Sequence, residues 1–326
     1  MNYDDIFSIS SFKEFEVISL EVFRHQYYNN EVYRQFCRHL NIKQEQVTHL
    51  KAIPFLPIDL FKSHKIISGN EEHQTIFTSS GSTGMVTSKH FVTDMSLYEK
   101  SFLTAFNKFY GNPKEWIILA LLPSYLEREG SSLIYMANRL IEESVHPSSG
   151  FYLNNHEELA MALRQSENKG RKTLLIGVSF ALLDLLEKHK FNRLEKTIIM
   201  ETGGMKGRRR EMIREELHEI LTEGFNVKSI HSEYGMTELL SQAYSKGDGV
   251  FECPSWMKIF IRDPEDALTY LPEGKTGGIN IIDLANVNSC SFISTQDLGK
   301  DLGNGKTSIL GRFDHSDIRG CNLMVV

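Results

Sequence analysis

Short apolar runs alternate with amphipathic stretches along the middle of this chain. The runs are typical of buried strands; they cover residues 116–122, 173–176, 197–200 and 227–230. The amphipathic stretches repeat apolar side chains at helical spacing; they cover residues 96–109, 133–142, 157–167, 180–188 and 208–221. Strands that alternate with helices predict an α/β fold with a mostly parallel sheet, covered by helices on both faces.

The pattern changes toward both ends of the chain. Residues from about 11 to 50 carry apolar side chains at helical spacing, so we predict a helical N-terminal extension over 1–52. After about residue 243, Gly, Asp and Pro become frequent, and the apolar runs at 256–261 and 278–282 are short. These features predict a small β-rich subdomain over 243–326. We expect these parts to form a single domain over 1–326.

Composition narrows the class of protein. The 326 residues are 41% hydrophobic and 24% charged, with a formal net charge of -6 and no basic stripe, which argues against a nucleic-acid partner. No apolar run approaches the ~20 residues of a membrane span, and the polar N-terminus does not resemble a signal peptide. The four cysteines lack zinc or C-x-x-C spacing. We therefore expect a cytoplasmic protein with free thiols.

One loop is unusually rich in hydroxyls and glycines. Its residues are Thr78, Ser79, Ser80, Gly81, Ser82, Thr83 and Gly84. Glycines let backbone N–H groups approach a phosphate, hydroxyls add uncharged donors, and Lys89 follows with a positive charge. The spacing does not fit the common phosphate-binding loop, which needs Gly, four residues and then Gly-Lys-Ser/Thr. The loop predicts polyphosphate binding in another fold, or else an ordinary surface turn.

Three further loops follow predicted strands, where ligands bind in sheets of this kind. The pair Gly203 and Gly204 would let a flat ring lie on the backbone. Segment 234–238, Tyr-Gly-Met-Thr-Glu, offers an aromatic face, a hydroxyl and a carboxylate, the groups that adenine, phosphate and Mg²⁺ require. Asp297, expected at a strand end, could hold a ribose diol with two hydrogen bonds. Each loop alone is equally explained as a turn or a cap.

The order of these loops is more specific than any single one. Together with Gly-Arg-Phe-Asp at 311–314, they follow the order seen in adenylate-forming enzymes, and the chain resembles that superfamily from about residue 53 onward. Segments 123–128, 231–239 and 317–321 are most similar to the acyl-protein synthetases of bacterial luminescence operons. Phenylacetate–CoA ligases are a more distant resemblance.

The resemblance implies the large N-terminal domain of the adenylate-forming fold and a two-step reaction. ATP activates a fatty acid as an acyl-adenylate, and the acyl group then moves to a cysteine near the C-terminus. The implied partners are a carboxylic acid substrate and an acyl-accepting protein such as a reductase or a carrier. The oligomeric state is left open, and a homo-oligomer is one possibility.

The same resemblance assigns roles on the phosphate side. Loop 78–84 would hold the β and γ phosphates, with Lys89 nearby. Glu238 would hold Mg²⁺, and Thr237 would contact the α-phosphate. His231 would face the carboxylate or the α-phosphate, although a structural histidine is an equal alternative.

On the adenosine side, the resemblance assigns an adenine site and a ribose site. The adenine residues are Gly203, Gly204, Tyr234 and Gly235. Asp297 and Arg312 would position the ribose.

Typical members of the superfamily continue past the Gly-Arg-Phe-Asp hinge into a lid domain that brings a lysine to the adenylation site. This sequence ends at Val326, so we expect no lid and look for that charge at Lys89 or on a partner chain. Cys321 is the expected acyl carrier, because thioester formation needs a thiolate. The alternative is a tail cysteine without a role.

Two other functions stay open at this stage. The first is an acyl- or aryl-CoA ligase, which would use CoA rather than Cys321 as the acceptor. The second is a non-catalytic subunit that binds nucleotide or acyl groups within an acyl-transfer or acyl-reducing complex. The phosphate loop and the pair Thr237 and Glu238 argue against the second.

Overall fold

The computed structural model describes residues 3–79, 86–123, 130–203, 210 and 212–312. In this part of the chain, the strands form a twelve-stranded sheet and a separate two-stranded sheet. The large sheet has the order β11-β12-β13-β14-β10-β9-β8-β7-β6-β4-β5, and β1 pairs with β13. The predicted mixed α/β architecture is confirmed.

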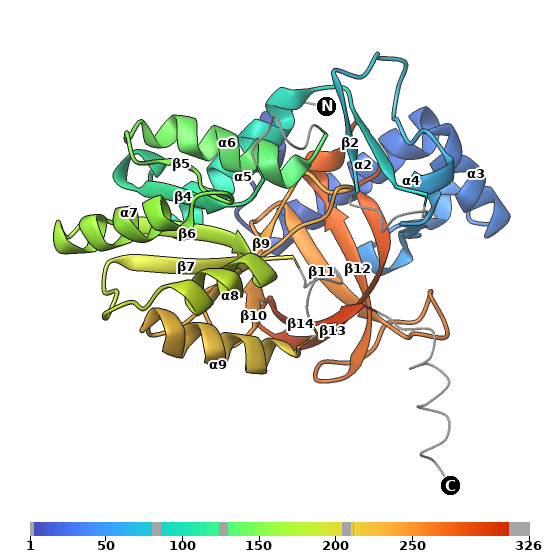
Figure 1. Ribbon diagram of the computed structural model, residues 1–326. Coiled ribbons are helices and arrows are strands. Elements are labelled where there is room, and N and C mark those ends of the chain that lie inside the picture. The colour runs from blue at the N-terminus through green and yellow to red at the C-terminus, as the bar shows by residue number, and fades with distance from the viewer. Residues whose placement is uncertain (1–2, 80–85, 124–129, 204–209, 211, 313–326) are drawn as a thin grey trace, which may run out of the picture.

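One half of the large sheet is parallel. Its strands are β4 (Ile117–Leu121), β5 (Gly150–Phe151), β6 (Thr173–Val178), β7 (Thr197–Thr202) and β8 (His231–Tyr234). The helices of this half are α5 (Met95–Tyr110), α6 (Ser132–Ser144), α7 (His156–Asn168), α8 (Ser179–Lys188) and α9 (Arg214–Phe225). Figure 1 shows α5 and α6 on one side of the parallel strands and α8 and α9 on the other, so both faces are covered.

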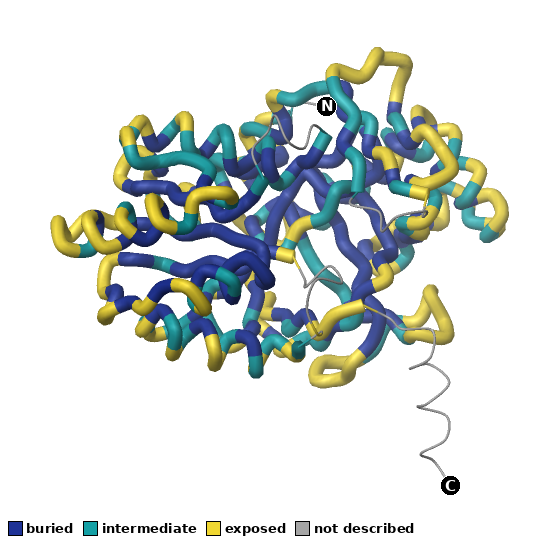
Figure 2. The backbone as a smooth tube through the Cα atoms, in the orientation of Figure 1, coloured by how far each residue is buried: buried dark blue, intermediate teal, exposed yellow. Residues whose placement is uncertain are grey.

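The other half is antiparallel and is reached at β8, which pairs with β9 in the antiparallel sense. Its strands are β9 (Ala243–Ser245), β10 (Val250–Glu252), β11 (Met257–Arg262), β12 (Thr276–Asp283), β13 (Phe292–Gly303) and β14 (Lys306–Arg312). Strand β1 (Leu56–Pro57) adds to β13 in parallel. The two-stranded sheet is the hairpin of β2 (Thr75–Thr78) and β3 (Lys89–Val92). Figure 2 shows that the strands of both halves are largely buried.

Two predicted boundaries are wrong. The strand predicted over 227–230 lies four residues later, at His231–Tyr234. Asn226 ends α9 in a left-handed conformation, and the apolar residues after it lead into the strand. The helix predicted from residue 208 begins at Arg214, where acidic side chains at 215 and 216 suit the positive end of the helix dipole.

The N-terminal helices pack against the antiparallel half. They are α1 (Tyr3–Phe7), α2 (Phe12–Asn29) and α3 (Glu31–His39), followed by the short helix α4 (Leu60–Ser63). The rings of Phe23 and Tyr33 lie 6.3 and 5.9 Å from the ring of Phe292 on β13. Gln26 of α2 donates to the carbonyl of Val287 over 2.9 Å and accepts from the Ser291 amide over 3.0 Å. These contacts fix α2 to the segment between β12 and β13.

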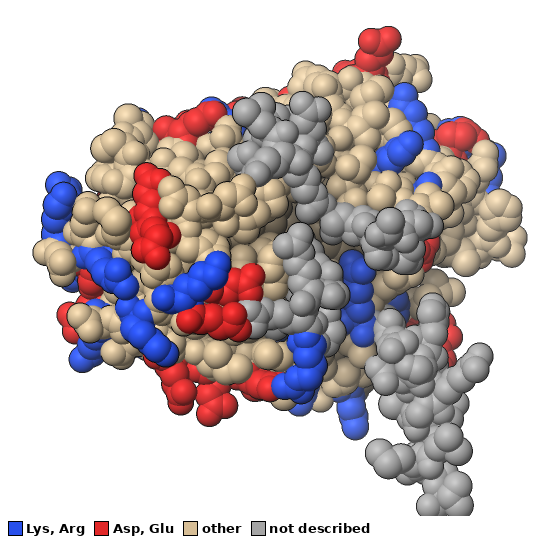
Figure 3. All heavy atoms as spheres, viewed as in Figure 1, with Lys and Arg blue, Asp and Glu red and all other residues tan. Residues whose placement is uncertain are grey.

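The division into a body, an extension over 1–52 and a subdomain over 243–326 stays a proposal, since β1 and β9 to β14 belong to the same sheet as β4 to β8. Among the described residues, no helix has the length and apolarity to cross a bilayer. On the face that Figure 3 shows, basic and acidic side chains are interspersed.

Candidate active site

The carboxyl ends of β7 and β8 lie side by side and carry two of the predicted ligand loops. The strands are parallel with Thr202 opposite Glu233, so Gly203 and Tyr234 lie at the same level. The Thr202 hydroxyl donates to Glu233 Oε2 over 2.5 Å and joins the two ends. The structure thus brings Gly203 and Tyr234 together. Gly204 lies outside the described residues.

Two glycines shape this edge of the sheet. Gly203 has a φ of 70°, which favours glycine, and its carbonyl accepts a hydrogen bond of 2.6 Å from the Ser179 hydroxyl. At Gly235, a Cβ atom would lie only 2.6 Å from Glu233 Oε1. A side chain at Gly235 would therefore displace the Glu233 carboxyl that is joined to Thr202.

Tyr234, Asp297 and Arg312 converge although they are distant in sequence. The Tyr234 hydroxyl donates to Asp297 Oδ2 over 2.7 Å. Asp297 and Arg312 are cross-strand partners on β13 and β14, with Arg312 Nε 3.9 Å from Asp297 Oδ1. The Arg312 side chain is 85% exposed, so it is free to move toward a ligand.

Asp297 does not lie at a strand end, as the sequence had suggested, but within β13. Burial raises the pKa of its carboxyl, while the hydrogen bond from Tyr234 and the charge of Arg312 oppose that shift. A buried carboxylate with one oxygen already oriented by Tyr234 is suited to accept hydrogen bonds from a sugar diol.

Glu238 is 7% exposed and lies just beyond the end of β8. Burial raises the pKa of its carboxyl, and a hydrogen bond with Ser88 and the charges of Arg312 and Lys62 lower it. Ser88, which sequence reasoning missed, thus connects Glu238 to the base of the hydroxyl-rich loop. No group of three or more potential His, Cys, Asp or Glu metal ligands lies together within the described ranges.

A buried polar network supports the turn that carries Thr237 and Glu238. His90 Nδ1 lies 2.8 Å from the Thr237 carbonyl, and its Nε2 lies 3.0 Å from Asn286 Oδ1. The Asn286 amide donates to the Glu238 carbonyl over 2.7 Å. Burial lowers the pKa of His90 to about 4, and its two hydrogen bonds oppose that shift. His90 and Asn286 position the turn, and no sequence motif pointed to either.

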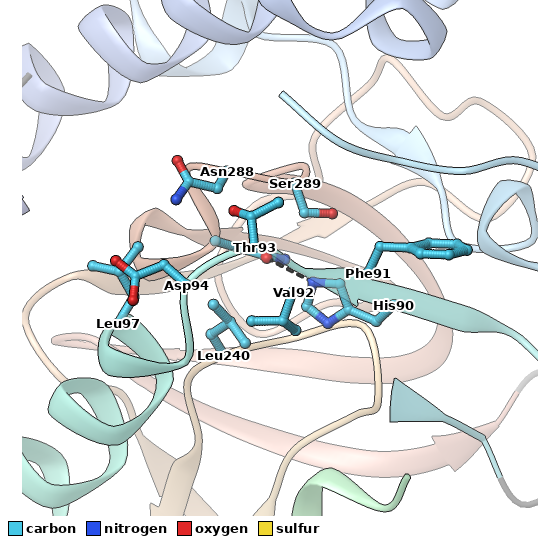
Figure 4. Close-up of a pocket in the computed structure, with 10 residues that line it drawn as sticks. His90, Phe91, Val92, Thr93, Asp94, Leu97, Leu240, Asn288 and Ser289 are labelled. Carbon is cyan, nitrogen blue, oxygen red and sulfur yellow. Dashed lines mark hydrogen bonds between the residues drawn. The ribbon is translucent and has the colours of Figure 1, made fainter. Parts of the chain in front are cut away.

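Figure 4 shows His90 and its hydrogen bond at a small cavity beside this network. The cavity holds about 10 Å³ and is lined partly by Thr93, Leu97 and Asn288. That is room for about one water molecule and far too little for a nucleotide. This cavity is therefore not a nucleotide site.

The base of the hydroxyl-rich loop is held by the β2–β3 hairpin. Thr78 lies opposite Lys89 in that hairpin. The Ser88 amide donates to the Ser79 hydroxyl over 3.0 Å, and the Ser79 amide donates to the Ser88 carbonyl over 3.2 Å. Lys89 is exposed. The remaining loop residues lie outside the described ranges; they are Ser80, Gly81, Ser82, Thr83 and Gly84.

His231 lies at the opposite end of β8 from the site. It is the first residue of the strand, three steps of about 3.3 Å from Tyr234, or roughly 10 Å away. Its Nδ1 lies 3.2 Å from the Tyr110 hydroxyl. Burial and the nearby charge of Lys246 lower the pKa of His231 to about 4. These contacts favour the structural alternative for His231.

The thiols that the structure describes are poor nucleophiles. Cys37 and Cys290 are buried, and Cys253 is partly exposed. Burial raises the pKa of Cys37 and of Cys253 to about 12, and it raises that of Cys290 as well. Cys321 lies outside the described residues.

The fold is that of the adenylate-forming ligases. A 2-hydroxyisobutyryl-CoA ligase crystallised with 2-HIB-AMP and CoA aligns with a TM-score of 0.63 at 13% identity, over 93% of this chain and 70% of that one. ATP-bound MatB from Rhodopseudomonas palustris aligns with a TM-score of 0.52 at 19% identity, over 73% of this chain and 47% of that one.

The family match is more specific. The family model described as "Acyl-protein synthetase, LuxE" matches residues 10–104. The long-chain-fatty-acid–luciferin-component ligase of Vibrio harveyi is 24% identical over 92% of this chain and 84% of its own length. The ligase of the same name from Photorhabdus luminescens is 34% identical over 67 residues, which are 20% of this chain and 57% of that protein. The predicted resemblance to acyl-protein synthetases is confirmed.

Proposed function

We propose that this protein uses ATP to activate a carboxylic acid of the fatty acid class as an acyl-adenylate, and then transfers the acyl group to a protein thiol. One observation carries the first step. Tyr234, Asp297 and Arg312 converge beside Gly203 at the edge of the sheet, next to the turn that holds Glu238. This is the set of groups that adenosine and its phosphates require, in the fold of the adenylate-forming ligases.

The chemistry of adenylation depends on charge and position. A carboxylate oxygen of the acid attacks the α-phosphorus, the bond to the β-phosphate breaks, and pyrophosphate leaves with the electron pair. In this proposal Asp297 holds the ribose, Tyr234 and Gly203 enclose adenine, and Thr237 contacts the α-phosphate. Oriented donors and charges of this kind are the main source of catalysis in phosphoryl chemistry.

Mg²⁺ is the metal that fits the proposed site. In phosphate sites it is held by one or two carboxylates together with substrate phosphates and water. Glu238 supplies one buried carboxylate, connected through Ser88 to the hydroxyl-rich loop. Bound there, the metal would neutralise phosphate charge, while Glu238 fixes its position relative to Asp297.

Cys321 is our candidate for the acceptor thiol of the second step. The thiols at 37, 253 and 290 have raised pKa values and would rarely ionise at neutral pH. The names of the relatives, long-chain-fatty-acid–luciferin-component ligases, support a fatty acid substrate and a further acyl-accepting protein. We expect the reaction to take place in the cytoplasm, where thiols stay reduced.

Carboxylate-dependent ATP–pyrophosphate exchange tests the first step. The full chain is incubated with Mg²⁺, ATP, labelled pyrophosphate and a panel of fatty and aryl acids. Exchange that depends on one class of acid is the expected result and names the substrate class. Tight ATP binding without exchange for any acid would overturn the proposal in favour of a non-catalytic binding subunit.

Acylation with a labelled fatty acid tests the second step. We expect Cys321→Ala to abolish the hydroxylamine-sensitive label on the protein and to leave pyrophosphate exchange intact. Cys253→Ala is the matched control and should keep the label. Thioester formation on CoA that survives Cys321→Ala would identify an acyl-CoA ligase instead.

A further inference from the structure

A lysine on the short helix α4 is connected to the segments that form the candidate site. Lys62 pairs with Asp59, with Nζ 2.6 Å from Oδ1, and the lysine side chain is 38% exposed. The ammonium group has three N–H donors. Asp59 is the partner that the described part of the chain shows for it, so Lys62 can still donate to a ligand.

Two connections attach α4 to the strand that carries Asp297. Strand β1 pairs with β13, and directly after it the Ile58 amide donates to the Ser294 carbonyl over 3.0 Å. Asp59 Oδ2 then accepts a hydrogen bond of 2.5 Å from the Gln296 side chain, the neighbour of Asp297. The Lys62–Asp59 pair is thereby attached to Gln296, the residue that precedes Asp297 in β13.

A third connection attaches α4 to the turn that carries Glu238. The Phe61 ring packs edge-on against the His90 ring, with centroids 5.8 Å apart. His90 in turn contacts the Thr237 carbonyl over 2.8 Å.

Helix α4 is connected to the segments that carry both proposed sites, and these connections indicate which group Lys62 could contact. In a bound ATP, the α-phosphate joins the ribose to the β and γ phosphates. Asp297 is proposed to hold the ribose, and Glu238 is proposed to hold the metal of the phosphates. A cation fixed between the two would therefore lie beside the α-phosphate.

We propose that Lys62 is a catalytic residue that donates to the non-bridging oxygens of the α-phosphate while the acid displaces pyrophosphate. The role rests on the proposed adenylation function. Negative charge on these oxygens rises as the new C–O–P linkage forms and the Pα–O bond to pyrophosphate breaks, and no proton is transferred. A fixed ammonium group stabilises that charge more than the ground state.

Lys89 and Lys65 are informative comparisons. Lys89 begins β3 opposite Thr78, beside the hydroxyl-rich loop proposed for the β and γ phosphates. Lys65 lies three residues beyond Lys62 and faces the Phe91 ring, with Nζ 5.5 Å from its centroid. Within the described residues, these contacts join Lys89 and Lys65 to β2 and β3 rather than to β13, so we expect Lys62 rather than either of them to act on the α-phosphate.

The test is pyrophosphate exchange at saturating ATP in the full chain, with ATP affinity measured separately by calorimetry. We expect Lys62→Met to lower the exchange rate at least ~30-fold with less than ~3-fold change in ATP affinity. Lys62→Arg should restore a large part of the rate, and Lys65→Met should stay within ~2-fold of the parent protein. Asp59→Asn removes the negative charge of the partner side chain and leaves the lysine charge in place. We expect its exchange rate to fall less than ~5-fold.

Each failure has a distinct meaning. Exchange by the parent protein together with a Lys62→Met rate within ~3-fold of it overturns the role of Lys62 alone. Equal losses of ATP affinity in Lys62→Met and Asp59→Asn, with exchange at saturating ATP unchanged, would reduce Lys62 to holding the Gln296 segment. A rate that depends on Lys89 but not on Lys62 would also overturn the inference. No exchange by the parent protein with any acid overturns the proposed function itself.

Discussion

The two halves of the large sheet contribute to the candidate site in different ways. In the parallel half, Gly203 and Tyr234 come from the carboxyl ends of adjacent strands, where position along the strand is enough to bring them together. In the antiparallel half, Asp297 and Arg312 lie within the register of β13 and β14 and meet as cross-strand partners. A parallel sheet thus places ligand loops by its topology, whereas an antiparallel sheet places single side chains by its register.

The strongest way to test this comparison is to remove the carboxylate at the end of β8. We expect Glu238→Gln to lower acid-dependent pyrophosphate exchange by ~10²-fold or more, because charge stabilisation at a reacting phosphate is worth several kcal/mol. Glu252→Gln, on the exposed end of β10 in the antiparallel half, is the control and should behave as the parent protein. A near-normal exchange rate in Glu238→Gln would remove Glu238 from the metal site.

The antiparallel contribution can be tested through ATP affinity. Asp297→Ala should weaken ATP binding by ~30-fold, since a hydrogen bond to a charged group contributes about 1.5–3 kcal/mol. Tyr234→Phe keeps the ring and loses only the 2.7 Å hydrogen bond to Asp297, so we expect a smaller loss of ~5-fold. Calorimetric titration measures both. Unchanged affinity in Asp297→Ala would exclude this side chain from the ribose site.

The contact that joins β7 to β8 predicts a pH dependence of stability. Burial raises the pKa of Glu233 to about 7 from the usual value of 4.5. A raised carboxyl pKa stabilises the fold at low pH, and this contribution is lost as pH rises from 4.5 through 7. Glu233→Gln has no charge to bury and should gain about 3 kcal/mol over the parent protein at pH 8, with no gain at pH 4. Denaturant titration at both values measures it, and an equal effect at both would show that the charge is irrelevant.

The smallest effect is expected at the amino end of β8. His231→Phe keeps the ring packing against Tyr110 and loses one contact of 3.2 Å. We expect the exchange rate to stay within ~2-fold, because His231 begins the strand whose far end carries Tyr234. A loss comparable to that of Glu238→Gln would restore His231 to the chemistry and place reacting groups at both ends of one strand.

Much of the parallel half could be predicted from the sequence, because β4, β6 and β7 are largely buried and each contains an apolar run. Strand β8 was misplaced for a physical reason. Its sequence is His-Ser-Glu-Tyr, and its buried polar groups are satisfied by side chains such as Thr202 and His218, so no apolar run marks it.

The motifs predict several site residues, but not the residues that contact them in the structure. His90 contacts Thr237 across 147 positions and Asn286 across 196. Lys62 contacts Asp59, and Asp59 contacts Gln296 of β13, which lies 237 positions further along the chain. Such contacts depend on the register of β1, β3 and β13, and a single sequence does not specify that register.

The attachment of α2 to the segment before β13 limits how this protein can be shortened. Gln26 satisfies the carbonyl of Val287 and the amide of Ser291, and Asn30 donates to the Ser289 carbonyl over 2.9 Å. A deletion of residues 1–52 would leave these buried groups without partners and expose the ring of Phe292. Because the same segment carries Asn286, a fragment that starts at residue 53 would lose both solubility and the geometry of the Glu238 turn. Expression boundaries, tags and fusions should therefore leave the first helices intact.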